Sequence, residues 1–196
     1  MKKLASIAVA LLLVGSVFAQ SGSYKLNDKV ADFSLKDGQG KAVSLTDYAG
    51  KKAVVVVFIN NTCPYAKLYE ERLVNLASAY AGKGIQFVFI NPNIGSGEGS
   101  ETLQDLAGKN YSFPYLADEG QVQSAKFGAT KTPEAFVLLQ NEGQFVLKYK
   151  GAIDDNPQVA DQVKSFFLKN VIEEVLSNKT VSSLERRATG CLIKKY

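Results

Sequence analysis

A short run of branched apolar residues that ends at a cysteine and a proline constrains this fold more than any other feature. Residues 54–59 are all apolar and mostly β-branched, which favours a buried parallel strand over a helix. Pro64 directly follows Cys63, and proline is favoured at the first helical position because an N–H there would lack an intrahelical partner. The pattern predicts a buried strand, a turn and a helix from Pro64, with Cys63 at its amino end.

The position of Cys63 allows two interpretations. At a helix start, unpaired backbone N–H groups and the helix dipole stabilise a thiolate, which predicts a reactive cysteine. The alternative is a buried structural cysteine, because free cysteine is among the most buried residue types. Lys67, on the same helical face, either lowers the pKa of this thiol or is a solvated surface lysine. Thr62 is expected to cap the helix or to donate a hydrogen bond to the sulfur.

The chain has 196 residues, two cysteines and no histidine. The lack of histidine excludes imidazole metal sites and nucleophiles activated by histidine. Two thiols without an imidazole argue against structural zinc, and the glycines at 95, 97 and 99 lack dinucleotide-binding spacing, so we predict neither metal nor cofactor. Cys63 and Cys191 lie 128 positions apart, and the sequence leaves open whether they pair.

The first residues have the pattern of a signal peptide. Lys2 and Lys3 precede the apolar residues 4–14, and Val-Phe-Ala at 17–19 resembles a cleavage site, so we expect residues 1–19 to be removed after about Ala19. The apolar stretch is shorter than the about 20 residues that span a bilayer. We expect a periplasmic or secreted protein without a stable membrane span; a retained N-terminal anchor is the alternative. The remaining formal charge of about +2 argues against nucleic acid as a partner.

Strand and helix patterns alternate along the rest of the chain. Extended segments at 30–35 and 43–45 flank a turn, which predicts a β-hairpin. Residues 64–81 carry one apolar stripe at helical spacing, formed by Tyr69, Leu73, Leu76, Ala77 and Tyr80. An apolar strand follows at 85–90, so residues 54–90 predict a strand–helix–strand unit with parallel strands.

The second half predicts short helices, a hairpin and a long helix. We expect helices at 101–109 and 119–127, a strand that begins after Pro133, and an antiparallel return at 144–150. Asn156 and Pro157 are expected to begin a last helix that runs to about Leu176, with Asp154 and Asp155 solvated in the preceding loop. A polar tail then leads to Cys191.

This order of elements, with Cys63 after the first core strand and Thr132-Pro133 before a later one, resembles the thioredoxin-like fold. More narrowly, it resembles the alkyl hydroperoxide reductase/thiol-specific antioxidant (AhpC/TSA, peroxiredoxin-like) family. The similarity is to a subgroup with Cys-Pro-Tyr-x-Lys and C-terminal Gly-Cys-x-Ile-Lys motifs, here at residues 63–67 and 190–194. It implies an α/β three-layer sandwich with a mixed central sheet, flanking helices and an added N-terminal β-hairpin. We expect this domain over 24–178, followed by a tail over 179–196.

The resemblance also implies roles for site residues and partners. Pro133 resembles the cis-proline that faces the active-site cysteine, so that Pro64, Thr132 and Pro133 would contact an extended partner. Cys191 would be a resolving thiol that forms a disulfide with oxidised Cys63; a static disulfide and an unpaired thiol are the alternatives. The implied partners are a peroxide or a protein disulfide, together with an external thiol reductant such as a thioredoxin-like protein.

These features predict an exported thiol oxidoreductase, with three hypotheses for its activity. The first, which the family resemblance favours, is a peroxidase-like antioxidant in which Cys191 resolves oxidised Cys63. The alternatives are a disulfide reductase or isomerase that acts through mixed disulfides, and a non-catalytic module with a structural Cys63–Cys191 disulfide. Ala66 rules out a Cys-x-x-Cys motif, and Asn60 and Val56 depart from the Pro-x-x-x-Thr-x-x-Cys frame of peroxiredoxins. The sequence leaves open the substrate, the electron donor and the oligomeric state.

Overall fold

The structure is a computed structural model that describes residues 22–95, 97–181 and 184–195. The expected signal peptide, residues 1–19, lies outside the described residues. No helix within the described ranges is both long and apolar enough to cross a membrane.

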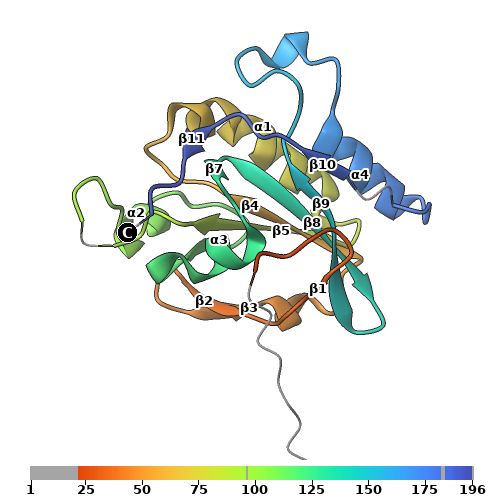
Figure 1. Cartoon of the computed structure of the whole chain (residues 1–196), viewed down its shortest axis with the longest axis horizontal. Coiled ribbons are helices and arrows are strands. Elements are labelled where there is room, and N and C mark those ends of the chain that lie inside the picture. The colour runs from red at the N-terminus through yellow and green to blue at the C-terminus, as the bar shows by residue number, and fades with distance from the viewer. Residues whose placement is uncertain (1–21, 96, 182–183, 196) are drawn as a thin grey trace, which may run out of the picture.

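A mixed β-sheet forms the centre of the molecule (Figure 1). Its strands follow the order β1-β9-β8-β4-β5-β6-β2-β3, and β10 pairs with β9 as an additional strand. β4, β5 and β6 are parallel to one another, whereas β8 is antiparallel to both β4 and β9. The strands are β1 (Lys29–Val30), β2 (Ser34–Asp37), β3 (Ala42–Ser44), β4 (Ala53–Phe58), β5 (Ile85–Asn91), β6 (Tyr115–Ala117), β8 (Glu134–Asn141), β9 (Gln144–Gly151) and β10 (Leu184–Arg186).

A separate two-stranded sheet pairs β7 (Lys131–Thr132) with β11 (Cys191–Leu192). The α-helices are α1 (Pro64–Ala81), α2 (Leu103–Ala107), α3 (Val122–Phe127) and α4 (Phe167–Leu176). Short 3₁₀ helices are η1 (Leu45–Tyr48), η2 (Glu119–Gln121) and η3 (Ala160–Gln162).

Alternate residues of β4 pack into two different cores, because successive side chains of a strand point to opposite faces. Val55 belongs to the cluster that contains Leu73 of α1 and Ile172 of α4. Val56 belongs to the cluster that contains Phe127 of α3. In Figure 1, α1 and α4 lie above the sheet, and α3 and the β2–β3 hairpin lie below it. The predicted α/β sandwich with a mixed central sheet is confirmed.

The strand–helix–strand unit agrees with its prediction. α1 begins at Pro64 and ends at Ala81, and Cys63 is its N-cap residue. Tyr69, Leu73, Ala77 and Tyr80 of the predicted stripe are buried against the sheet. β4 and β5 are parallel and in register along their whole paired length, as the crossover through α1 requires.

The N-terminal hairpin forms, but its first strand is shifted along the chain from the prediction. β2 and β3 pair antiparallel around the predicted turn, and β2 extends the central sheet by pairing with β6. Val30, placed by the prediction in the hairpin, instead belongs to β1 and pairs with Phe145 at the opposite edge of the sheet. The alternating pattern of residues 30–35 therefore comes from two short strands rather than one.

The prediction that the last helix begins at Pro157 is wrong, since α4 begins at Phe167. Arg72 holds the start of this segment as a loop: its Nη1 and Nη2 donate to the carbonyl oxygens of Asn156 and Pro157, at 2.8 and 2.7 Å. These carbonyls are held by α1 and do not accept from amides four residues later, as a helix would require.

The expected solvation of both loop aspartates holds for one of them. Asp155 is exposed, whereas Asp154 is 6% exposed. Its carboxylate lies 2.8 Å from Arg72 Nη1 and accepts a hydrogen bond of 2.7 Å from the Tyr69 hydroxyl. Asp154 therefore ties the loop to α1, because a buried carboxylate needs a cation and hydrogen-bond donors.

The C-terminal tail is part of the folded structure. β10 runs parallel to β9, and Glu185 of β10 lies 3.2 Å from Lys150. Gly151 permits this contact, because a Cβ there would lie 1.6 Å from the Arg186 carbonyl oxygen. Further along, β11 pairs antiparallel with β7. The tail therefore pairs with the body through two short strands, β10 and β11.

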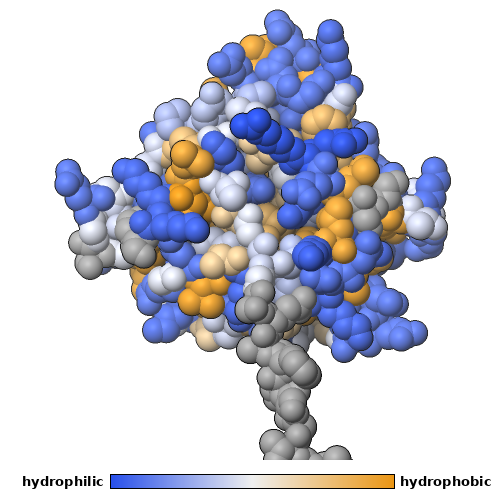
Figure 2. All heavy atoms as spheres, in the orientation of Figure 1, coloured by the Kyte–Doolittle hydropathy of each residue, from blue (hydrophilic) through white to orange (hydrophobic). Residues whose placement is uncertain are grey.

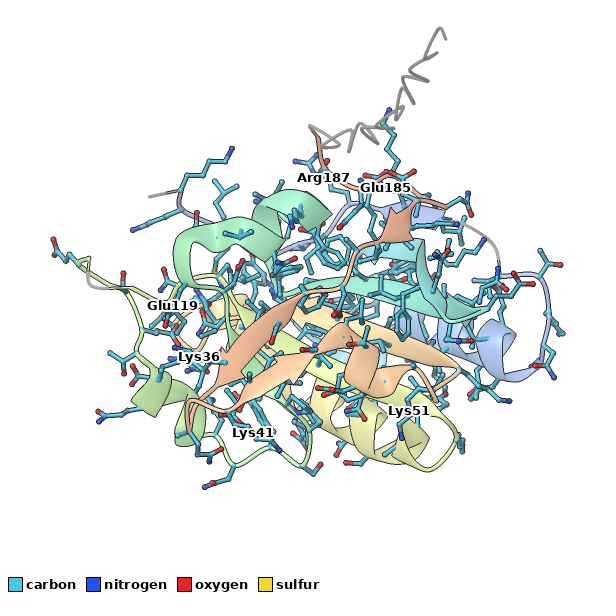
Figure 3. The ribbon with its side chains drawn as sticks, turned by 90° about the horizontal axis from the view of Figure 1, so that it is seen from below. Lys36, Lys41, Lys51, Glu119, Glu185 and Arg187 are labelled. Atoms are coloured by element: carbon cyan, nitrogen blue, oxygen red, sulfur yellow. A yellow bond between two sulfur atoms is a disulfide. The ribbon has the colours of Figure 1, made fainter. Side chains whose placement is uncertain are left out.

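Charged side chains of both signs are spread around the molecule. Figure 3 shows Lys36 and Lys41 on the hairpin, Lys51 after η1, and Glu185 and Arg187 on the tail. On the face shown in Figure 2, hydrophilic residues predominate, and hydrophobic ones form scattered groups.

Candidate active site

Cys63 lies at the carboxyl end of β4, where α1 begins, and is 3% exposed. Its backbone N–H donates to Asn60 Oδ1 at 3.1 Å, and its carbonyl accepts from the Lys67 N–H at 3.1 Å. The N-cap position places a side chain beside the unpaired amides of the first helical turn. Pro64 occupies the first helical position, as predicted.

Cys63 and Cys191 are joined by a disulfide, with their Cα atoms 5.9 Å apart. Neither cysteine of the chain is free. The sequence left the pairing open, and the structure brings the two ends of this 128-residue separation together. A pair of cysteines that can form and break a disulfide at a helix start is sufficient for thiol–disulfide exchange.

The predicted cis peptide bond is present between Thr132 and Pro133. The Thr132 carbonyl oxygen lies 3.1 Å from Cys63 Sγ, and its hydroxyl donates to Asn60 Oδ1 at 3.4 Å. Thr132 is therefore in direct contact with the cysteine loop. Since a disulfide sulfur carries no proton, only the reduced thiol could donate a hydrogen bond to this carbonyl.

The contacts of Thr62 differ from its predicted roles, and the side chain of Lys67 is exposed. Cys63 rather than Thr62 is the N-cap residue, and the Thr62 hydroxyl lies 3.4 Å from Glu101 Oε1, so its expected roles as cap or sulfur donor are corrected. Lys67 is exposed, and its ammonium group forms none of the hydrogen bonds or ion pairs found in the described part of the chain. Against the opposing effect of burial, hydrogen bonds from Lys109 and Tyr111 lower the pKa of Glu70, and the charge of Lys67 adds to this shift.

Glu101, which sequence reasoning missed, holds the loop before Cys63. Its carboxylate is buried, at 4% exposure, and its Oε1 accepts from the N–H groups of Asn61 and Thr62 at 2.9 and 3.3 Å. Its Oε2 accepts from Asn91 Nδ2 at 2.9 Å. No local sequence pattern identifies Glu101, because Asn61 and Thr62 lie about 40 residues earlier in the chain and Asn91 lies on β5.

Tyr115 extends this network beneath the site. Its hydroxyl accepts from Asn91 Nδ2 at 3.0 Å and donates toward Asn61 Oδ1 at 3.2 Å. Burial, and then the negative charge of Glu101, hold the pKa of Tyr115 well above its usual value. The phenol therefore stays protonated and fixes the orientation of the Asn61 amide.

The C-terminal strand β11 covers the loop that carries the cis-proline. Cys191 pairs with Thr132, and the Ile193 N–H donates to the Thr130 carbonyl at 3.0 Å. Gln121 Nε2 secures the last residues through the Lys194 carbonyl at 2.5 Å. A cavity of about 180 Å³ remains beside the disulfide, lined in part by Asn60, Thr62, Pro64, Pro92 and Lys194.

Glu134, which sequence reasoning also missed, binds the backbone at the start of β7. Its Oε2 accepts from the N–H groups of Thr130 and Lys131 at 2.8 and 3.0 Å. Burial raises the pKa of Glu134, although these hydrogen bonds oppose the shift. The backbone turn before the cis bond is thus held by a carboxylate behind it.

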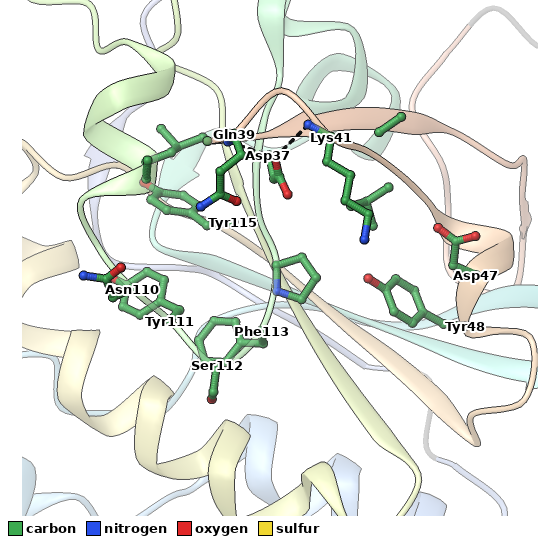
Figure 4. A pocket seen from close by; sticks show the side chains of 16 residues that line it. Asp37, Gln39, Lys41, Asp47, Tyr48, Asn110, Tyr111, Ser112, Phe113 and Tyr115 are labelled. Carbon is green, nitrogen blue, oxygen red and sulfur yellow. Dashed lines mark hydrogen bonds between the residues drawn. The ribbon is translucent and has the colours of Figure 1, made fainter.

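A larger hollow of about 830 Å³ lies elsewhere, between the β2–β3 hairpin and residues 110–115 (Figure 4). Lys41, Tyr48 and Tyr111 line it, and burial followed by the charge of Asp47 raises the pKa of Tyr48 to about 12. Neither cysteine lines this hollow, whereas both line the smaller cavity.

Among the residues that the structure describes, no group of three or more Asp, Glu or Cys side chains is placed to hold a metal ion. The site that remains is a pair of sulfurs, an asparagine and a threonine around them, and a carboxylate behind the loop. Such a site can exchange a disulfide bond with an external thiol.

Comparisons with known proteins agree with this chemistry. The AhpC/TSA family matches residues 26–156. Thiol-disulfide oxidoreductase ResA of Halalkalibacterium halodurans is 22% identical over 151 residues, which cover 76% of this chain and 82% of that protein.

Solved structures match the fold more closely. A hypothetical protein from Sinorhizobium meliloti 1021 has a TM-score of 0.78 and 33% identity, covering 89% of this chain and 97% of that one. The exposed lipoprotein thioredoxin of Streptococcus pneumoniae has a TM-score of 0.53 and 20% identity, covering 76% and 99%, and supports the thioredoxin-like fold alone. With this fold and a family match over most of its length, the chain is a thiol oxidoreductase that belongs to the AhpC/TSA family.

Proposed function

We propose that this protein exchanges disulfides with protein or peptide partners, with Cys63 as the attacking thiolate and Cys191 as the second thiol. The observation that carries the proposal is the Cys63–Cys191 disulfide, located at the N-cap of α1 and against the Thr132 carbonyl. The name of the ResA relative, a thiol-disulfide oxidoreductase, supports the same chemistry. The motifs at residues 63–67 and 190–194 would then mark a subgroup defined by these two sulfurs.

The proposed cycle has two exchange steps. The Cys63 thiolate attacks a partner disulfide, forming a mixed disulfide and releasing one partner thiolate. The Cys191 thiolate then attacks Cys63 Sγ, which forms the intramolecular disulfide and releases the second partner thiolate. The partner gains two electrons, and an external dithiol reductant returns two electrons to the protein.

The residues around the sulfurs have distinct parts in this cycle. The amide groups of the first turn of α1 stabilise the Cys63 thiolate. Asn60 and Glu101 orient the loop that carries it, while Lys67 is too exposed to act as more than a distant positive charge. Thr132 and Pro133 present the backbone edge on which a partner would lie.

A peroxidase-like activity is the second candidate, favoured by the AhpC/TSA family match. Here Cys63 attacks a peroxide oxygen and becomes a sulfenic acid while the peroxide leaves as an alcohol or water. Cys191 then condenses with the sulfenic acid, which forms the disulfide and releases water. The Thr62 hydroxyl, which faces Glu101, is not placed as a donor toward the sulfur. This is why we rank disulfide exchange first.

We further propose that the protein works outside the cytoplasm, after removal of residues 1–19, because disulfides persist in oxidising compartments. The working unit would be the domain over 24–178 with its tail over 179–196. Partners would be protein thiols or disulfides and an external thiol reductant.

The deciding experiment compares two oxidants on the reduced mature protein and on its Cys63→Ser and Cys191→Ser variants. We expect a disulfide-bonded peptide to consume both thiols, and Cys191→Ser to accumulate a mixed disulfide on Cys63, seen by mass spectrometry. Rapid oxidation by one equivalent of hydrogen peroxide, with a sulfenic acid trapped in Cys191→Ser, would favour the peroxidase instead. A disulfide that resists both thioredoxin and excess dithiothreitol would refute both activities and leave a structural disulfide.

A further inference from the structure

The chain's own tail occupies the backbone edge at which a partner would bind. β11 pairs antiparallel with β7, with Cys191 opposite Thr132 and Leu192 opposite Lys131. The sulfur of Cys191 is at the same time bonded to Cys63. The oxidised protein therefore contains, within one chain, the arrangement of a cysteine-bearing strand captured by Cys63.

The residue before the captured cysteine lies against rigid backbone. A Cβ on Gly190 would lie 2.3 Å from the Thr132 carbonyl oxygen and 2.7 Å from its carbonyl carbon. Real Cβ atoms essentially never approach other atoms this closely, so one side must move. Gly190 itself is not in the left-handed region, so the restriction comes from contact and not from backbone strain.

Neither side of this contact can move freely. Thr132 is 1% exposed, its hydroxyl is bonded to Asn60, and the next residue is the ring-restrained Pro133. Glu134 holds the preceding amides of Thr130 and Lys131. On the other strand, the bond to Cys63 fixes the cysteine and therefore the residue that precedes it.

The positions after the cysteine impose different requirements. The side chain of Leu192 is 70% exposed, so almost any residue fits there. The next residue, Ile193, donates its N–H to the Thr130 carbonyl at 3.0 Å. Proline lacks this N–H and would lose the bond.

We propose that the reduced site accepts an extended cysteine-bearing strand in which glycine directly precedes the cysteine and the second residue after it is not proline. This deepens the proposed function and rests on it, since the partner must be joined to Cys63 through a mixed disulfide. The tail is then the intramolecular occupant of this site and competes with partners that carry the same pattern.

The test uses the full chain with Cys191→Ser, which leaves Cys63 as the sole thiol. The probes are blocked peptides Thr-Gly-Cys-Leu-Ile-Lys, Thr-Ala-Cys-Leu-Ile-Lys and Thr-Gly-Cys-Leu-Pro-Lys, each activated as a mixed disulfide with thionitrobenzoate. Attack by the Cys63 thiolate joins the peptide to Cys63 and releases thionitrobenzoate, whose absorbance gives the rate. The rates of the same probes with glutathione correct for intrinsic reactivity, and any competition from the serine tail affects all probes alike.

We expect the alanine probe to react about ten- to a hundredfold more slowly than the glycine probe, with the proline probe also slower. Equal corrected rates for the glycine and alanine probes would overturn the inference and leave the proposed function intact. Bis(2-hydroxyethyl) disulfide, too small to contact β7, separates the two: failure of Cys63 to react with it and with every probe would overturn both.

A second variant tests the contact within the chain. In the otherwise unchanged protein, Gly190→Ala should lower the equilibrium constant for forming Cys63–Cys191 against glutathione by about tenfold or more. Gly50→Ala is the matched control, because nothing lies within 4 Å of a Cβ at Gly50. An unchanged equilibrium in Gly190→Ala would contradict the proposed steric restriction.

Discussion

The disulfide between Cys63 and Cys191 should contribute a large part of the stability of this fold. It closes a separation of 128 residues, and the chain-entropy relation assigns about 5 kcal/mol at 25 °C to a loop of that length. Part of this is offset in the reduced native state, because the chain beyond Arg186 regains freedom when β11 is released. β10 still pairs with β9, which limits that freedom to the last few residues. We therefore expect oxidation to stabilise the fold by about 3–5 kcal/mol.

The assay is urea denaturation of the oxidised protein, of Cys191→Ser, and of the double variant with Cys63→Ser. The midpoint should fall in both variants, and the melting temperature should drop by about 10 °C for a domain of this size. Cys191 is the better single site to change, since it is half-buried and outside the main core, whereas Cys63 is 3% exposed and begins α1.

The same free energy must appear in the redox equilibrium. The free energy by which the disulfide stabilises the fold equals the free energy by which folding stabilises the disulfide. The reduction potential of the disulfide should therefore be about 60–110 mV lower in the native chain than in the urea-unfolded chain. A stability loss below about 1 kcal/mol would refute the entropic argument. So would a potential difference that disagrees with the denaturation result.

Three further predictions concern residues around the site. Glu101→Gln removes the negative charge to which the N–H groups of Asn61 and Thr62 donate. We therefore expect the free energy of unfolding, measured in urea, to fall by about 1–3 kcal/mol and disulfide exchange at Cys63 to become slower. Burial raises the folded-state pKa of Glu134 above 4.5, so that between the unfolded and folded pKa values the folded chain binds more protons than the unfolded chain. Stability measured by denaturation should therefore fall as the pH rises through this window, and Glu134→Gln should remove that slope. Gly151→Ala would place a Cβ 1.6 Å from the Arg186 carbonyl oxygen, so β10 should detach, and the chain from residue 184 up to the disulfide at Cys191 should become sensitive to protease.

Each of these predictions has a result that contradicts it. Unchanged stability and exchange rate in Glu101→Gln would mean that the amide oxygen of glutamine holds the loop as well as the carboxylate does. A pH slope that persists in Glu134→Gln would assign it to another group. A tail that stays protected in Gly151→Ala, as in the Gly50→Ala control, would show that β10 pairing does not hold the tail.

Local sequence pattern was sufficient for the centre of the fold and for one half of the site. The β-branched run before Cys63, proline at the first helical position and one apolar stripe determine β4 and α1, because each signal is read within a few residues. Thr132-Pro133 was identified by its resemblance to a known motif, and the cis bond is present.

The rest depends on contacts between distant residues, which no local pattern encodes. Glu101 and Glu134 look like ordinary surface carboxylates in the sequence, and only the packed structure brings the amides of the Cys63 and β7 loops to them. The segment before α4 is held by contacts with distant residues, among them Arg72, whose guanidinium binds the carbonyls of Asn156 and Pro157.

The C-terminal tail shows most clearly the difference between what local sequence predicts and what tertiary contacts decide. Its sequence is polar and weakly periodic, so it predicts no strand by itself, and the cysteine within it could have been paired or free. The short β10 and β11 exist only because β9 and β7 offer unpaired edges and because Gly151 and Gly190 let the backbones approach. The sequence alone therefore determined that Cys63 would lie at the start of α1, through signals a few residues long. Tertiary structure decided which groups surround that sulfur and which cysteine it meets, because those depend on free energies of contact between segments more than a hundred residues apart.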